Sequence, residues 1–123
     1  MEREVEQAMD ESIILQFAFE TASLNIPSRY DVLQDTTIEE IGYNLEKGGQ
    51  RAGGRRIRIS DENKNVLYAG EDFGEGKEFL EHIRADNRIY QVINRGERYY
   101  IQTGARLEAL DRVLYLETLK DVT

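Results

Sequence analysis

The side chains best suited to hold a ligand are arginines and tyrosines on three expected strands. They are Arg56, Arg58, Tyr90, Arg98 and Tyr100. A guanidinium group donates several hydrogen bonds in a fixed fork, and tyrosine combines an apolar ring with a polar tip. Because these residues alternate with Ile57, Ile59 and Ile101, they could share the face of a sheet turned away from the core. The pattern favours an anionic or polar ligand, and ordinary sheet packing with solvated charges is the alternative.

Residues for covalent or metal chemistry are scarce. His82 is the one histidine, and the chain has no cysteine. Nucleophilic triads and zinc sites need histidine or cysteine with partners held nearby. We therefore expect no catalytic residue, no metal site and no cofactor. His82 is expected on the surface of a short helix.

One segment begins like a calcium-binding loop. Residues 61–65 carry side-chain oxygens at the first, third and fifth positions of the pattern. The pattern then breaks, because Val66 stands where glycine is needed and Asp72 where a bidentate glutamate is needed. The segment therefore predicts a hairpin turn.

Charge and length narrow the function classes. The 123 residues fit one domain, and the net charge of -8 comes from 24 acidic against 16 basic side chains. This balance disfavours nucleic acid and anionic lipid as partners, since both attract a concentrated basic surface. No stretch of the sequence approaches the roughly 18 apolar residues of a membrane span.

A long helix is expected to open the chain, over about residues 2–25. Its central apolar positions, with helical spacing toward the core, are Ile13, Ile14, Phe17, Thr21 and Leu24. Its first turns carry a thin seam of small or apolar residues, namely Val5, Ala8, Met9 and Ser12. A thin seam on a charged helix suits a partner helix, which predicts a homodimer. A frayed, solvated helix end is the alternative.

The remaining chain, about residues 36–123, is expected to carry the sheet. A second helix should begin near Asp35 or Thr36 and stop at Gly48 and Gly49. Alternating patterns predict strands at 56–60, 66–69, 88–93, 98–103 and 112–119, with a short helix at 77–84. Five antiparallel strands with helices grouped on one side form an α+β layer in a single domain, residues 1–123.

Two segments carry a family resemblance. Residues 56–68, RIRISDENKNVLY, resemble the first hairpin of extracytoplasmic PAS-like (Cache-type) sensor domains. The tail 114–123, LYLETLKDVT, is similar to the last strand of such domains in Gram-positive two-component sensor histidine kinases. The chain departs from the amine-binding Cache domains, whose aspartate and aromatic constellation has no counterpart that we can place here.

The resemblance implies a PAS/Cache-like five-stranded antiparallel sheet with a long N-terminal helix and two short helices. It also implies a sensing domain outside the cytoplasm, in a parent kinase anchored in the cell membrane by flanking spans. The input would be a small-molecule ligand or a membrane protein partner, read in part by the loops Gly48–Gly54 and Gly70–Gly76. The alternative is a cytoplasmic PAS-like interaction or dimerisation module of another regulator.

Overall fold

The computed structural model describes residues 1–24, 31–49, 55–71, 73–74, 76–85 and 87–123, without the side chains of 31–34 and 49. The described elements are α1 (Glu2–Ser23), α2 (Asp31–Gly49), β1 (Arg56–Ser60), β2 (Val66–Ala69), the 3-10 turn η2 (Glu78–His82), β3 (Ile89–Arg95), β4 (Arg98–Ala109) and β5 (Arg112–Asp121). The strands form one antiparallel sheet in the order β2-β1-β5-β4-β3. This confirms the predicted α+β class with five antiparallel strands, and it is consistent with a PAS-like fold.

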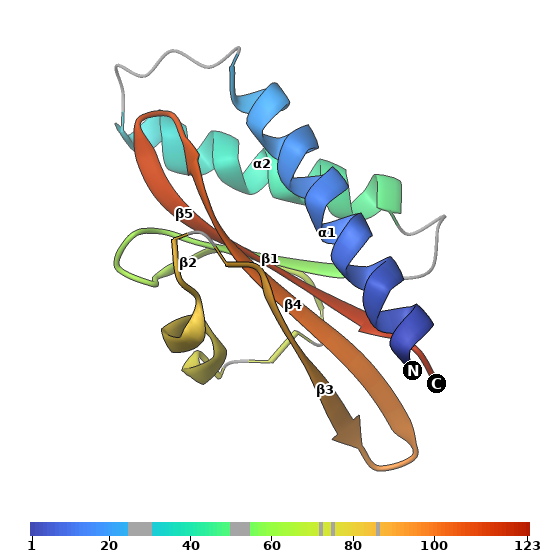
Figure 1. The fold of residues 1–123 in the computed structure, drawn as a ribbon. Coiled ribbons are helices and arrows are strands. Elements are labelled where there is room, and N and C mark those ends of the chain that lie inside the picture. Colours follow the sequence, from blue (N-terminus) through green and yellow to red (C-terminus); the bar gives the residue numbers. More distant parts are fainter. Residues whose placement is uncertain (25–30, 50–54, 72, 75, 86) are drawn as a thin grey trace.

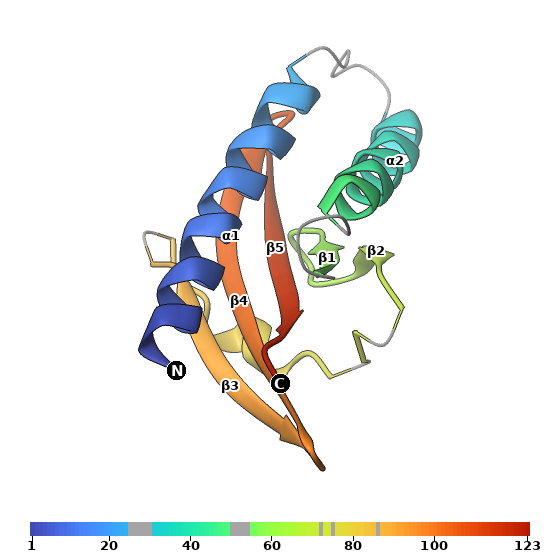
Figure 2. The same cartoon turned by 90° about the vertical axis from the view of Figure 1, so that its right-hand side faces the viewer.

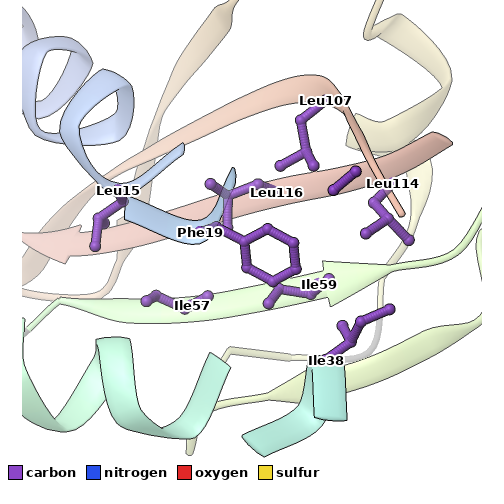
Figure 3. Packing of buried hydrophobic residues seen from close by; sticks show 9 residues of the cluster. Leu15, Phe19, Ile38, Ile57, Ile59, Leu107, Leu114 and Leu116 are labelled. Atoms are coloured by element: carbon purple, nitrogen blue, oxygen red, sulfur yellow. The ribbon is translucent and has the colours of Figure 1, made fainter. Parts of the chain in front are cut away.

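Both helices cover one face of the sheet, which we call the first face (Figures 1 and 2). α1 lies over β4 and β5, whereas α2 lies over β1 and β2. Between the layers is the main core, built from side chains of both helices and of strands β1, β4 and β5 (Figure 3). Its labelled members are Leu15, Phe19, Ile38, Ile57, Ile59, Leu107, Leu114 and Leu116. Burial of such side chains supplies the main stabilisation of a two-layer fold.

The buried face of α1 differs from the prediction. Its buried residues are Ala8, Ser12, Leu15, Phe19 and Ser23. The stripe expected to face the core is instead exposed, with Ile14 at 65 % and Phe17 at 71 % of full exposure. Both sets have helical spacing, so periodicity alone could not choose between them. Small side chains at Ala8, Ser12 and Ser23 let the helix approach the sheet closely, which explains the outcome.

Part of the α1 seam predicted to contact a partner helix packs against the sheet of the same chain. Ala8 and Ser12 are buried under the sheet, while Val5 and Met9 are half-buried. Ser12 also accepts a hydrogen bond of 2.6 Å from Arg88, which precedes β3. Ala8 and Ser12 therefore cannot form a free dimer seam, and an interface through α1 would need its exposed side.

The other helices also differ in extent. α2 begins at Asp31, earlier than the capping pattern at Thr36 predicts, and it is 19 residues long rather than short. The expected helix at 77–84 is a 3-10 turn of five residues. Pro27, expected to separate the first two helices, lies outside the described residues. So do residues 50–54 of the predicted glycine-rich loop Gly48–Gly54.

The hairpins follow the predicted turn chemistry. β2 has the predicted bounds, and the turn at 61–65 is closed by Asp61 Oδ1, which accepts hydrogen bonds from the amides of Asn63 and Asn65. β3 and β4 are joined at Gly96 and Glu97, and Gly96 has a φ of +70°. β4 extends six residues beyond its predicted end at Thr103. Among the described residues, no helix is long and apolar enough to cross a membrane.

Candidate functional site

The sheet face turned away from the helices, which we call the second face, carries an unusual set of polar side chains. Residues paired across antiparallel strands project to the same side. Because Ile57, Ile59, Leu114 and Leu116 point into the main core, their neighbours along β1 and β5 point to the second face. Register therefore places Arg58 of β1 opposite Glu117 of β5, the central strand of the sheet.

A chain of hydrogen bonds crosses four strands on this face. Arg58 of β1 donates from Nε and Nη2 to the two carboxylate oxygens of Glu117 of β5, at 2.6 and 2.8 Å. Gln102 of β4 donates to Glu117 Oε1 at 3.0 Å, and Gln91 of β3 donates to Gln102 Oε1 at 2.6 Å. We call these four residues the polar relay. It joins an exposed side chain, Gln91, to a fully buried carboxylate.

The buried end of the relay is an ion pair without access to water. The side chains of Arg58 and Glu117 are 1 % and 0 % exposed. Burial raises the pKa of Glu117, although the hydrogen bonds from Arg58 and Gln102 favour its charged form and lower it. An ion pair in such a place must be fully hydrogen-bonded to offset its desolvation. The relay provides these bonds.

Arg58 also holds the segment between β2 and β3. Its guanidinium lies over the ring of Phe73, 4.7 Å from the ring centre, and it donates to the carbonyl oxygen of Gly74 at 3.4 Å. A cation over an aromatic face is attracted by the ring, more strongly where water is excluded. Arg58 thus connects the central strands to the segment that covers the second face.

A hollow of about 340 Å³ opens between that segment and the sheet. We call it the second-face hollow. Its floor includes Gln91 and Gln102 of the relay, and its walls include Phe73, Phe79, His82 and Arg95. A concave site with apolar walls and a few convergent polar groups is the usual form of a small-molecule site. The hollow is therefore the candidate functional site.

A larger hollow of about 840 Å³ lies between the end of α1 and the β4-β5 turn. It is wide open to solvent and includes Phe17, Leu24 and Leu110 in its lining. The ion pairs at its lining join Arg112 to Asp35 and Glu62, whose side chains are 48 and 44 % exposed. We therefore place the site at the smaller hollow, where buried polar groups converge.

The five residues predicted to bind a ligand do not form one site. Arg58 lies in the relay, beneath the hollow. Tyr100 and Arg98 share the second face, but Arg98 is 66 % exposed and pairs with Asp121, while Tyr100 stacks under Arg95. Arg56 lies at the start of β1 beside a separate hollow with Tyr43 and Tyr68. Tyr90 pairs with Thr103 and so faces the helix side, which separates it from the others.

The sequence interpretation missed the acidic member of the relay. Glu117 follows Leu114 and Leu116 in a strand whose residues are mostly buried. A charged residue inside a buried strand needs a partner, and Arg58 in the alternating segment 56–60 was an available one. Gln91 and Gln102 carry no comparable signal, because only the β3-β4 register brings them together.

Comparison with known proteins identifies no relative. The chain matches no model of a protein family, no curated protein and no solved structure. In the described part of the chain, no group of three metal-binding side chains comes together. The geometry of the second face is therefore the structural basis for inferring a function.

Proposed function

We propose that this chain is the signal-sensing domain of a membrane-bound sensor histidine kinase and lies outside the cytoplasm. In this proposal it binds a small molecule in the second-face hollow, or a membrane protein partner, and carries no catalytic residue of its own. The family resemblance of residues 56–68 and 114–123 motivates the proposal, and the PAS-like strand order is consistent with it.

The observation that carries the proposal is the polar relay beneath the hollow. Gln91 and Gln102 line the hollow, and Gln102 is bonded directly to Glu117 on β5, the last strand of the chain. A ligand that pairs with these carboxamides would change the hydrogen bonds available to Glu117. Such a ligand shifts the equilibrium between the relay with and without the Gln102–Glu117 bond. The size of the shift equals the difference in the ligand's affinity for these two states.

The path from β5 to α1 also supports a signalling role. Lys120 of β5 and Arg55 before β1 both lie near the carboxylate of Glu11 on α1, at 3.2 and 3.3 Å. These three side chains are largely shielded from water. The beginning of α1 and the end of β5 lie at the same end of the molecule (Figures 1 and 2). In the proposal, both lead toward the same membrane.

A ligand screen with matched variants tests the proposed site. A ligand that binds only the folded chain raises its Tm in a concentration-dependent way. We expect a hit from a panel of metabolites and peptides to stabilise the wild type and Tyr90→Leu, but not Gln91→Leu. Tyr90 and Gln91 are neighbours on β3 and face opposite sides, so Tyr90→Leu controls for general effects on the strand. A hit that stabilises all three chains equally would place binding elsewhere, and a panel without hits would count against a small-molecule input.

An exposed face of α1 favours a second candidate, a cytoplasmic PAS-like interaction or dimerisation module. Ile13, Ile14, Phe17 and Leu24 are all more than half exposed. Contiguous exposed apolar side chains commonly mark a protein contact. Reading the gene on both sides of the coding segment separates the two candidates, because two flanking membrane spans support the sensor and their absence supports the cytoplasmic module.

A further inference from the structure

The described segment 76–85, which includes η2, covers the second face in an unusual way. Its backbone hydrogen bonds are local: Leu80 donates to Lys77 at 3.1 Å, and Ile83 donates to Leu80 at 3.2 Å. Within the described residues, no hydrogen bond of this segment reaches a strand. In Figure 1 the short turn, coloured yellow, lies on the side of the sheet opposite α1 and α2.

Among the described contacts, the packing of side chains attaches this segment to the sheet. Phe79, Leu80 and Ile83 are buried, at 8, 1 and 6 % exposure. Phe79 and Ile83 rest on Gly104 of β4, where a Cβ atom would come within 2.7 Å of each side chain. Because Gly104 has no side chain, Phe79 and Ile83 can pack directly against the backbone of β4. The strands beside it are joined by long antiparallel ladders that do not include this segment.

Regions with few buried contacts and no ladder hydrogen bonds open before the rest of a protein unfolds. We infer that residues 76–85 form a lid that opens from the second face as a unit while the sheet and both helices stay folded. Opening widens the second-face hollow and exposes Gln102, the buried part of its floor, whereas Gln91 is already exposed when the lid is closed. The inference concerns the ligand-free chain and does not depend on the proposed function.

The lid can leave the sheet without breaking a strand ladder. When closed, Phe79 and Ile83 fill the space above Gly104, which pairs with Glu117, and so cover the buried end of the relay. When open, the sheet retains its ladders, because the lid contributes none of their hydrogen bonds. His82 and Glu78 of the lid and Gln91 of the floor all line the hollow. A ligand that contacts Gln91 together with either of the two lid residues would therefore hold the lid closed.

Native-state amide hydrogen exchange of the full chain tests this inference. The amides of Leu80 and Ile83 should exchange with a lower free energy, and with a weaker dependence on urea, than ladder amides of β4 and β5. A small urea dependence means that little surface is exposed in the opening. If Leu80 and Ile83 exchange with the same free energy and urea dependence as the ladders, the lid does not open separately and the inference is wrong.

Two matched glycine variants sharpen the test. Gly104→Ala crowds Phe79 and Ile83 and should raise exchange at Leu80 and Ile83 about tenfold or more, with ladder amides little changed. Gly42→Ala crowds Ile59 and Tyr68 on the first face at 2.9 Å, so it should leave lid exchange unchanged. Should Gly104→Ala fail to fold, Ile83→Ala, which removes lid packing without crowding, must give the same selective increase. An equal increase in lid and ladder amides would overturn the inference.

Discussion

Arg58 of β1 and Glu117 of the central strand β5 form an ion pair with two hydrogen bonds, and water reaches neither side chain. The pair lies on the face opposite the main core, so the sheet has an apolar layer on one side and a charged centre on the other. A buried pair of this kind contributes little net stability by itself, but it makes each partner dependent on the other.

Removing one partner of this pair should therefore lower the stability of the folded chain. We expect Arg58→Met or Glu117→Leu to lower the free energy of unfolding by about 3–5 kcal/mol, because each leaves a buried charge without its counterion. Urea unfolding followed by circular dichroism gives the value directly. The double variant Arg58→Met/Glu117→Leu should recover most of the loss, except for about 1–3 kcal/mol from the unpaired amide of Gln102.

The double variant also decides between pairing and general packing. If the two single losses simply add in the double variant, the side chains act independently and the pair does not hold the second face together. Substitutions at distant, non-contacting sites behave in that additive way, so a recovery beyond about 0.5 kcal/mol identifies coupling.

The pH dependence of stability should carry the signature of Glu117. Burial raises its pKa in the folded chain, whereas glutamate in an unfolded chain has a pKa of about 4.3. The folded state then holds its proton to higher pH than the unfolded state does. The contribution of this group to stability is therefore full below the unfolded pKa and declines as pH rises through the folded pKa.

Carbon-detected NMR of the Glu117 carboxyl group measures the folded pKa, and urea unfolding at stepped pH measures the stability. We expect a midpoint above the ordinary glutamate value, together with a decline in wild-type stability over that window that Arg58→Met/Glu117→Leu lacks. A midpoint at or below the ordinary value would show that Arg58 and Gln102 outweigh burial.

The strands were more predictable than the faces of the helices. Alternation at Ile57 and Ile59, together with turn residues at 61–65 and Gly96, was enough to place β1, β2 and the β3-β4 hairpin, although not the full length of β4. α1 carries two stripes with helical spacing, and the prediction took the one with Ile13, Ile14 and Phe17. The buried stripe has equally large side chains at Leu15 and Phe19, so the size and period of the residues do not distinguish the two stripes.

The candidate site was harder to predict because it depends on register. Arg58 was nominated correctly as a polar residue of the second face, but its partner Glu117 lies 59 positions away in the sequence. Tyr90 was grouped with Arg98 and Tyr100, and the β3-β4 register places it on the other face. A shift of one residue in such a register reverses every side chain, so these contacts need the structure.

Gly70 should be intolerant of a side chain. A Cβ atom there would collide with the carboxylate of Glu46, which accepts hydrogen bonds from the Ile57 amide at 2.8 Å and the Tyr68 hydroxyl at 2.9 Å. We expect Gly70→Ala to lower the free energy of unfolding by about 1–3 kcal/mol through overpacking and loss of these bonds.

Gly48→Ala is the matched control, measured by the same urea unfolding. A Cβ atom at Gly48 meets nothing within 4 Å, and alanine is the better helix former. That variant should be neutral or more stable by up to about 1 kcal/mol. Equal losses in both variants would contradict the steric account of Gly70.

The exposed side of α1 makes a prediction about self-association. If the chain forms a homodimer through this helix, Phe17→Glu should shift it to monomer in analytical ultracentrifugation with the circular dichroism spectrum unchanged, because Phe17 is 71 % exposed and takes no part in the core. Tyr43→Glu, an exposed aromatic residue of α2, is the control and should leave the oligomeric state unchanged. A wild-type chain that stays monomeric at high concentration would exclude this face as a stable dimer contact.

The β4-β5 turn should become more stable when a glycine enters it. Leu110 and Asp111 both have a φ of +59°, the backbone of a type I′ hairpin turn, where glycine is favoured at the second position. We expect Asp111→Gly to raise the free energy of unfolding by about 0.5–1 kcal/mol, since glycine adopts this conformation without strain. Gly96→Ala is the reverse experiment: Gly96 has a φ of +70° with no atom within 4 Å of an added Cβ, so a loss of about 1 kcal/mol there would come from backbone strain alone. Opposite signs for the two variants in urea unfolding support this account. A loss of stability in Asp111→Gly would mean that contacts of the Asp111 side chain outweigh the strain of its backbone.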